Sequence, residues 1–417
     1  MNMINVRRLA VMTFLGAGML SDISAQDFSL QADTLNEARL PAQWDLQSCI
    51  DYALEQNITI RKNRVTAEST QIDVKTAKAA LFPSLSFSTS QQVVNRPYQE
   101  TSSRVSGSEI ISSNSKTSYN GNYGLNASWT IYNGSKRLKT LKQERLNNQV
   151  AELDVATSEN TIKESIAQIY IQILYAAESV RVNENTLQVS IAQRDRGQEL
   201  LNAGSIAKSD FAQLEAQVST DRYQLVTAQA TLQDYKLQLK QLLELDGENE
   251  MNVYLPNLSD ENVLAPLPAK KDVYVSALAI RPEIEASKLN VEASELGIDI
   301  AKSSYFPTVS LSAGIGTNHT SGSDFTFGEQ VKNGWNNSIG LSVSVPIFNN
   351  RQTKSAVQKA RLQRETNMLS LLDEQKALYK TIESLWLDAN SAQQRYAAAN
   401  EKLRSTQISY DLISEQF

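Results

Sequence analysis

The stretch from Gly134 to Leu201 constrains the fold of this chain more than any other segment. It contains no proline and, after Gly134 itself, only one glycine, at position 197. Its residues recur at alternating intervals of four and three, and all but the asparagine are apolar: Ile162, Ile166, Ile169, Ile173, Ala176, Val180, Asn183 and Leu187. This mean spacing of 3.5 residues predicts a helix with a heptad seam. At 1.5 Å per residue the helix would be roughly 100 Å long, which is unsuited to a compact enzyme domain.

The N-terminus has the pattern of a secretory signal peptide. Arg7 and Arg8 precede an apolar run of about 12 residues, which is too short to span a bilayer, and small residues follow before Gln26. We therefore predict a signal peptide over residues 1–25 and a polar leader over 26–43. The remaining chain has 38 basic and 45 acidic residues, a net charge of −7, which argues against nucleic acid as a partner.

Few residues in the chain are suited to catalysis or to metal binding. The sequence has one cysteine, Cys49, and one histidine, His319, so it supports neither a Cys/His metal cluster nor an internal disulfide. We expect Cys49 to be a buried helix residue and His319 to lie in a solvated polar loop. No phosphate-binding or dinucleotide-binding glycine motif is present in the sequence. We predict no catalytic, cofactor or metal site, and no enzyme activity.

Two strands with one apolar and one polar face precede the long helix. A helical pattern runs from Trp44 to about Leu81 and ends at Phe82-Pro83, because proline disfavours helix in the residue before it. Residues 84–89 then alternate with period two, and a polar stretch, 95–117, follows. In the second strand one face carries Tyr123, Leu125, Ala127, Trp129 and Ile131, while Ser, Asn, Gly and Thr residues occupy the other.

A return helix is expected after the long one. The sequence Asn202-Ala203-Gly204 ends the long helix, and Ser209 or Asp210 can cap a helix over 209–245. The return helix has its own heptad seam: Phe211, Leu214, Val218, Asp221, Leu225, Ala228, Leu232, Tyr235, Leu239 and Leu242. The two helices therefore form an antiparallel hairpin with its tip at Gly204. Residues 247–271 contain three prolines and read as a connector.

The second half of the chain repeats the first. Phe82-Pro83 recurs as Phe306-Pro307 at an offset of 224, and Ile131-Tyr132-Asn133 recurs as Ile347-Phe348-Asn349 at an offset of 216. Adding 216 to each seam position of the long helix gives only apolar or aromatic residues: Leu378, Ile382, Leu385, Ala389, Ala392, Tyr396, Ala399 and Leu403. We divide the chain into a first repeat, 44–246, the connector, 247–271, and a second repeat, 272–417, that lacks a return helix.

Each chain has only four strands with one apolar and one polar face, which are too few to form a closed barrel. A β-sheet within a membrane has to be a closed barrel, because lipid cannot hydrogen-bond to an open edge. Three chains would supply 12 strands, within the range of outer-membrane barrels. The lipid-facing side would carry Trp129, Ile131, Leu341, Val343 and Val345, with Val343 near the middle of its strand. Two shorter helices stacked end to end could flank each long helix and close into a tube. A secreted β-sandwich hairpin packed on helices is the alternative that these patterns leave open.

The ordered, duplicated features resemble the TolC-like outer-membrane efflux proteins from Trp44 to Phe417. The features are the paired Phe-Pro, the Arg281-Pro282-Glu283 helix start, the strand ending Ile347-Phe348-Asn349-Asn350-Arg351, and the tip Ala203-Gly204-Ser205 followed by Asp210. The resemblance implies a mostly α fold: duplicated antiparallel coiled-coil helices forming a trimeric α-barrel in the periplasm, and four strands per chain contributing to a shared 12-stranded β-barrel in the outer membrane.

The same resemblance implies a function and partners. The chain would be the exit duct of a tripartite efflux pump, working with a periplasmic adaptor and an inner-membrane transporter and needing no cofactor. Ala203, Gly204 and Ser205 would dock the adaptor, and Asp210 would contribute a polar contact to the closed tip. The alternatives are the outlet of a type I protein secretion system or, in a different class, a periplasmic coiled-coil scaffold that crosses no membrane. The sequence does not identify the substrate.

The last residue, Phe417, corresponds to Leu201 at the offset of 216. The second long helix is therefore present almost to its tip, whereas the first repeat continues with 41 further residues, Ser205 to Leu245. We expect the native chain to extend beyond Phe417 by a similar length. The family places its inner constriction there, so no constriction residue is assigned.

Overall fold

The computed structural model describes residues 43–98, 102–106, 109–113, 116–246, 251–256, 263–321, 323 and 325–415. The predicted signal peptide, most of the polar leader, parts of the connector 247–271 and the last two residues lie outside these ranges.

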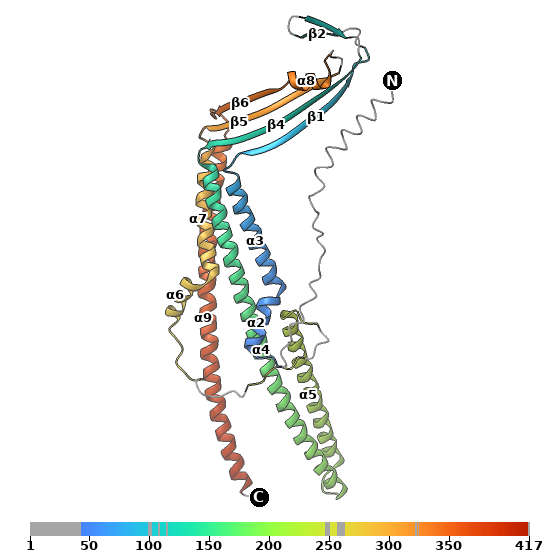
Figure 1. Cartoon of the computed structure of the whole chain (residues 1–417). Helices are drawn as coiled ribbons and strands as arrows, with labels where there is room; N and C mark the ends of the chain where they lie inside the picture. Colours follow the sequence, from blue (N-terminus) through green and yellow to red (C-terminus); the bar gives the residue numbers. More distant parts are fainter. Residues whose placement is uncertain are drawn as a thin grey trace.

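Two long helices, α4 (Lys136–Asn202) and α9 (Gln352–Ser414), run down the molecule below a β-sheet (Figure 1). Three shorter helices flank them: α3 (Ile58–Ala79), α5 (Lys208–Leu242) and α7 (Pro282–Ser303). Helices α2 (Leu46–Gln56) and α6 (Lys270–Ile280) precede α3 and α7, and α8 (Phe327–Asn333) is a short helix beside the sheet. No helix within the described ranges is both long and apolar enough to cross a membrane.

The heptad seam of α4 is confirmed. Five of its eight positions are buried: Ile162, Ile166, Ile173, Ala176 and Leu187. Asn183 is partly buried, and its side-chain amide donates to the Ser179 carbonyl at 2.8 Å, within the same helix. All ten predicted seam positions of α5 are partly or fully buried, so α4 and α5 form the predicted antiparallel hairpin.

The main hydrophobic core lies where α2, α3, α4 and α5 meet. Its fully buried members include Cys49, Ile60, Ile166 and Leu239, and Trp44, from the segment before α2, packs with them. Burial raises the pKa of the Cys49 thiol to about 12, so the thiol stays protonated and packs as a small apolar side chain. The expectation of a buried, structural Cys49 is confirmed.

The prediction of one continuous helix from Trp44 to Leu81 was wrong, because the chain breaks at Asn57. Asn57 is extended (ψ 124°), and its side-chain oxygen accepts from the backbone N–H groups of Thr59 and Ile60 at the start of α3. Its side-chain amide donates to the Leu242 carbonyl at 3.0 Å, at the end of α5. One side chain therefore caps two helices, and α3 rather than α2 meets α5 end to end.

Four strands form one antiparallel sheet in the order β1-β4-β5-β6. They are β1 (Ser84–Asn95), β4 (Thr117–Asn133), β5 (Thr308–Thr320) and β6 (Asn336–Ser344). The polar stretch predicted as a loop also contains strands: β2 (Ser102–Ser106) and β3 (Glu109–Ser113) pair as a separate hairpin. Serine-rich segments have weak period-two patterns, which explains why this hairpin was not predicted.

The elements of the two halves correspond at the same two offsets. Helices α2 and α3 and strand β1 begin 224 residues before α6, α7 and β5, and α4 begins 216 residues before α9. The strand-to-helix turn also recurs: φ is positive at Gly134 and Ser135, and again at Asn350 and Arg351. Helix α6 was not predicted, and it begins two residues before the proposed start of the second repeat.

Candidate functional site

The sheet has one continuous polar face across all four strands. Its register aligns small polar residues in rows, such as Ser84, Ser128, Ser312 and Gly340. The Ser84 and Ser128 hydroxyls are 2.8 Å apart, and the Ser312 hydroxyl donates to the Gly340 carbonyl at 3.3 Å. Because these side chains are short and hydrogen-bond across the strands, the face is hydrophilic and the rows carry no large side chains.

The opposite face is apolar in the half of the sheet nearer the helices, and no element in the described part of the chain covers it there. One of its rows is Leu85, Ala127, Ala313 and Ile339, and the next contains Phe87, Leu125 and Ile315. The exposed fractions are high for such residues: 68% for Phe87 and 83% for Ile339. Soluble proteins rarely leave a contiguous apolar surface of this kind open, so this face is suited to contact another apolar phase or another chain.

The residues predicted for the apolar face differ in whether they pair with a neighbouring strand. Trp129 and Leu341 both pair with Leu311 in one row, and the Trp129 indole N–H donates to the Leu81 carbonyl at 2.8 Å. A β-bulge lies between Thr130 and Tyr132, so Ile131, which is half exposed, has no register partner on β5.

The positions predicted in β6 need a correction. Val343 is one residue from the end of the strand rather than near its middle, and Val345 lies beyond the end. The strand stops early because the following proline, Pro346, cannot donate to a β-ladder. Both valines are more than half exposed.

His319 lies in β5 and not in the solvated loop that we expected. It pairs with Gly121, where an added Cβ would be 2.3 Å from the imidazole ring. The ring is surrounded by Tyr119, Tyr123 and Phe327, with centroid distances of 4.9–5.9 Å. This aromatic cluster closes the end of the sheet farthest from the helices, and α8 packs against it.

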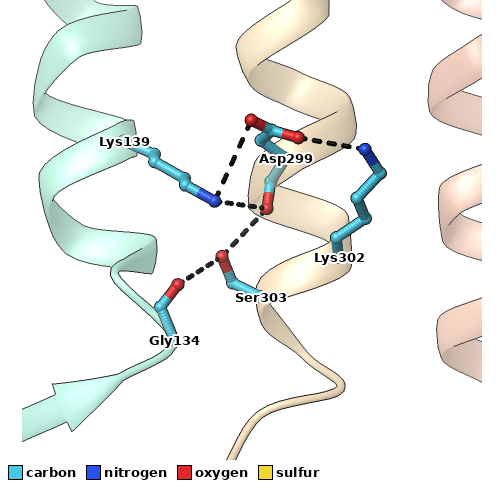
Figure 2. Close-up of polar contacts among 5 residues, drawn as sticks. All are labelled: Gly134, Lys139, Asp299, Lys302 and Ser303. Carbon is cyan, nitrogen blue, oxygen red and sulfur yellow. Dashed lines mark hydrogen bonds and ion pairs between the residues drawn. The ribbon is translucent and has the colours of Figure 1, made fainter.

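A polar junction joins the other end of the sheet to the helices (Figure 2). Gly134 has φ 68°, and a Cβ there would be 2.7 Å from the Ser303 carbonyl, so the close approach of β4 and α7 needs glycine. The buried Ser303 hydroxyl donates to the carbonyls of Gly134 and Asp299, both at 2.9 Å. Lys139 and Lys302 approach the Asp299 carboxylate at 4.0 and 3.2 Å.

The α4–α5 tip ends in a well-defined helix cap. The Ser205 N–H donates to the Leu200 carbonyl and the Gly204 N–H to the Leu201 carbonyl, at 2.8 and 2.9 Å. This is a Schellman motif, and Gly204 supplies its left-handed residue with φ 74°. Apart from Gly204 itself and its two chain neighbours, no described heavy atom lies within 4 Å of the position that a Gly204 Cβ would take, so the tip presents an open surface.

Asp210 is the third residue of α5, not its N-cap as we expected. The helix starts at Lys208, and the Asp210 carboxylate accepts from the Ala207 N–H at 3.3 Å. An acidic residue in this first turn is stabilised by the exposed N–H groups and the helix dipole.

Helices α4 and α5 pack closely near the tip at Gly197, the one glycine inside the long helix. It is buried, and a Cβ there would be 2.4 Å from the end of the Leu214 side chain. Sequence reasoning identified neither the role of Gly197 nor those of Ser303 and Asn57. The isolated glycine in an otherwise helical pattern was the one signal that could have indicated close helix packing.

Comparison with known proteins identifies a family with this architecture. The family model of the outer membrane efflux proteins matches residues 49–244 and 273–417. The chain is 25% identical over 260 residues to the outer membrane efflux protein BepC of Brucella suis, covering 62% of this chain and 54% of BepC. It is 24% identical over 303 residues to the outer membrane protein TolC of Escherichia coli, covering 69% of this chain and 59% of TolC. The matches thus span little more than half of these relatives.

Solved structures share the fold. The outer membrane protein VceC of Vibrio cholerae superposes with a TM-score of 0.69 at 18% identity, covering 88% of this chain and 83% of VceC. The mostly helical architecture with four antiparallel strands per chain is thus the one found in that protein. The chain belongs to the outer membrane efflux protein family and is, as its members are, a protein of the bacterial outer membrane.

Proposed function

We propose that three copies of this chain form an outer-membrane channel that passively conducts substrates from a periplasmic tunnel to the exterior. In this proposal the channel is the exit duct of a tripartite efflux pump. The observation that carries it is the open four-stranded sheet, with one polar and one apolar face, set on a row of long helices. A periplasmic scaffold would have no use for such a sheet.

Closure of the sheet requires other chains. The outer edges of β1 and β6 are the two ends of the strand order, and an open edge is not tolerated in lipid. Three chains give 12 strands, an even number within the bacterial range. The polar rows would then line water, and the apolar rows would meet lipid, with Trp129, Ile131, Leu341, Val343 and Val345 on or near the lipid side.

The spacing of aromatic residues along β4 supports this orientation. Tyr119 belongs to the aromatic cluster at one end of the sheet, and Trp129 lies ten residues away at the helix end. Ten residues of strand span about 33 Å, and a tilt of about 40° reduces this to roughly 25 Å along the membrane normal. This distance matches the apolar band of outer-membrane barrels, which aromatic residues flank at both interfaces.

The channel is proposed to conduct without chemistry. The energy for export would come from an inner-membrane transporter, and a periplasmic adaptor would dock at the hairpin tip, Ala203, Gly204 and Ser205. The two repeats, 44–246 and 272–417, would each supply one part of the helical wall. Conduction along a polar lining needs neither a cofactor nor a catalytic residue.

The test of this function is ion conductance across planar bilayers by the protein purified from outer membranes. We expect a stepwise increase in conductance for each inserted oligomer, and restoration of drug resistance in a bacterium from which the native exit duct has been deleted. An intact oligomer that does not conduct, or a chain that fractionates with soluble periplasmic proteins, would contradict the proposal.

Asp210 is proposed to hold the closed tip through its charge. Asp210→Asn keeps an oxygen acceptor for the Ala207 N–H, so helix α5 should start unchanged. We expect higher single-channel conductance and greater sensitivity to large antibiotics than in the native protein. Asp195→Asn is the control, since Asp195 is an exposed carboxylate near the same tip that pairs with Arg194 of its own helix. If the Asp210→Asn channel has the conductance of the native channel, the proposed role of Asp210 in holding the tip closed is wrong. Its remaining role would be the stabilisation of the start of α5.

A further inference from the structure

Helix α8 packs on one particular face of the sheet, toward the end away from the long helices (Figure 1). The Thr317 hydroxyl donates to the Val331 carbonyl of α8 at 2.7 Å, and the Phe327 ring meets the His319 ring edge to face with centroids 4.9 Å apart. Thr317 and His319 follow Ile315 at intervals of two along β5, so all three side chains project from the same face. Helix α8 therefore lies on the apolar side of the sheet and not on the polar side.

Hydrogen bonds fix α8 and the chain before it in this place. The Gln330 side-chain oxygen accepts from the Thr320 N–H at 2.8 Å, and its amide donates to the Phe325 carbonyl at 3.0 Å. Thr326 and Glu329 form a capping box at the start of the helix. The helix is therefore joined to β5 through its side chains and is not an independent loop.

The rows under α8 differ from those nearer the long helices. Thr317 and His319 are polar, whereas the next row on the same face contains Phe87, Leu125 and Ile315. Without α8 the Thr317 hydroxyl and the imidazole would project toward whatever apolar phase meets that row, and a polar group is costly to bury there without a hydrogen-bond partner. Helix α8 thus lies where this face changes from apolar to polar.

The segment around α8 exposes aromatic side chains. Phe325, Phe327 and Trp335 are 51%, 44% and 58% exposed. Trp335 directly precedes Asn336, which pairs with Gly316 on the polar face, so the alternation of β6 assigns Trp335 to the apolar face. Aromatic residues are typical of the boundary between lipid headgroups and acyl chains, because their rings are apolar and the indole N–H still reaches water.

The depth of α8 fits the same boundary. Thr317 pairs with Tyr123, which is four residues nearer the helices than Tyr119, the outer aromatic level of β4. Four residues of strand span ~13 Å, or roughly 10 Å along the membrane normal at a tilt of about 40°. Helices that lie in a membrane interface bury their apolar side by about 5–10 Å. Leu125 lies deeper, beyond the row that α8 contacts.

We propose that α8, together with Phe325 and Trp335, is an interfacial element that contacts lipid at the boundary between headgroups and acyl chains in the outer leaflet. It separates Thr317 and His319 from the acyl chains and so determines where lipid contact with the sheet begins. Strand β5 has a neighbouring strand on each side, so α8 lies within the face of one chain, away from the edges at which copies would meet. The inference rests on the proposed channel, whose apolar face meets lipid; the contact of α8 is what it adds.

Fluorescence quenching by spin-labelled lipids tests this contact. A Cβ at Gly328 would have no described heavy atom within 4 Å beyond Gly328 and its two chain neighbours, so Gly328→Cys can carry a fluorophore on α8. The native Cys49 is fully buried and should remain unlabelled. For the labelled oligomer in phosphatidylcholine vesicles, we expect a nitroxide on the lipid headgroup to quench the fluorescence more than a nitroxide deep in the acyl chain.

Two further positions provide matched controls. Ser338→Cys is a near-isosteric change on the polar face of β6, where Ser338 pairs with Gly314, and neither nitroxide should quench a label there. A label at Leu125→Cys should be quenched more by the deep nitroxide. Quenching at Leu125 without quenching at Gly328, or deeper quenching at Gly328 than at the headgroup, would overturn the inference and leave the channel standing. An unquenched label at Leu125, or a quenched one at Ser338, would contradict the orientation of the sheet and with it both proposals.

Trp335 supplies a reading without a label, should the fluorophore prevent assembly. Headgroup nitroxides should quench part of the native tryptophan fluorescence, and Trp335→Phe should remove a share of that quenchable part. Trp44 is buried in the helical core and should contribute none of it. A quenchable part that is unchanged in Trp335→Phe would show that Trp335 does not reach lipid, and this result would overturn the inference.

Discussion

Replacing Leu125 by Lys is expected to reduce assembly into the outer membrane by roughly 30- to 900-fold, the equivalent of about 2–4 kcal/mol for Lys on the lipid face near the bilayer midplane. Leu125 lies on the apolar face of β4 between Phe87 and Ile315, and between the two aromatic levels at Tyr119 and Trp129. A Lys there would have to bring its charge into hydrocarbon. The measurement is the fraction of the chain recovered as outer-membrane oligomer.

The neighbouring residue provides the matched control. Asn126 is on the polar face of the same strand, where its side-chain amide donates to the Ser88 hydroxyl at 3.3 Å. Asn126→Lys should assemble nearly as well as the native chain, because its charge would meet water. An equal loss of assembled oligomer in the two variants would contradict the proposal that one face of the sheet meets lipid and the other meets water.

A position nearer the membrane interface provides a third variant for the same assembly measurement. Val343 pairs with Val309, which is two residues closer to the helices than Leu311, the partner of Trp129. It therefore lies near the interface, where a Lys costs only about 0–1 kcal/mol, and Val343→Lys should be much milder than Leu125→Lys. A Val343→Lys defect as severe as that of Leu125→Lys would place the midplane elsewhere along the strands.

Sequence periodicity predicted the long elements because their packing is regular. The seams of α4 and α5, the alternation in β4 and the glycine at the tip each follow from local patterns that tertiary contacts reinforce. The break at Asn57 was not predictable in this way. Residues 46–79 keep a helical pattern, and the break depends on the Leu242 carbonyl, 185 residues away in sequence.

The errors at the sheet have a similar cause. His319 lies in a stretch of Gly, Thr, Asn and Ser that reads as a loop, but β4 is long enough to hold it in a ladder opposite Gly121. Likewise, the bulge between Thr130 and Tyr132 changes which residue of β4 continues the apolar row. A bulge depends on the pairing of two strands, so the alternation within one strand does not predict it. Local sequence specifies the faces of the strands, while pairing specifies where each strand ends.

Replacing Gly204 by Asp is expected to abolish export while leaving the amount of assembled oligomer unchanged. Gly204 has φ 74°, so any L residue there is strained by about 1–2 kcal/mol, a cost confined to the tip. The new side chain would enter open space, since no described heavy atom beyond Gly204 and its two chain neighbours lies within 4 Å of the Cβ position. The expected loss therefore comes from a charge placed in the proposed adaptor contact and not from damage to the hairpin.

Gly204→Asn separates charge from backbone strain. Asn has the shape of Asp, is neutral, and accepts the left-handed conformation more readily than most residues. The measurements are drug export in cells, oligomer yield, and crosslinking of the tip to the co-purifying periplasmic adaptor. We expect Gly204→Asn to export nearly as well as the native chain and Gly204→Asp to lose both export and crosslinking. Export at the native level in Gly204→Asp would show that the adaptor does not depend on this tip, since a carboxylate in the centre of a docking contact would otherwise be buried without a partner.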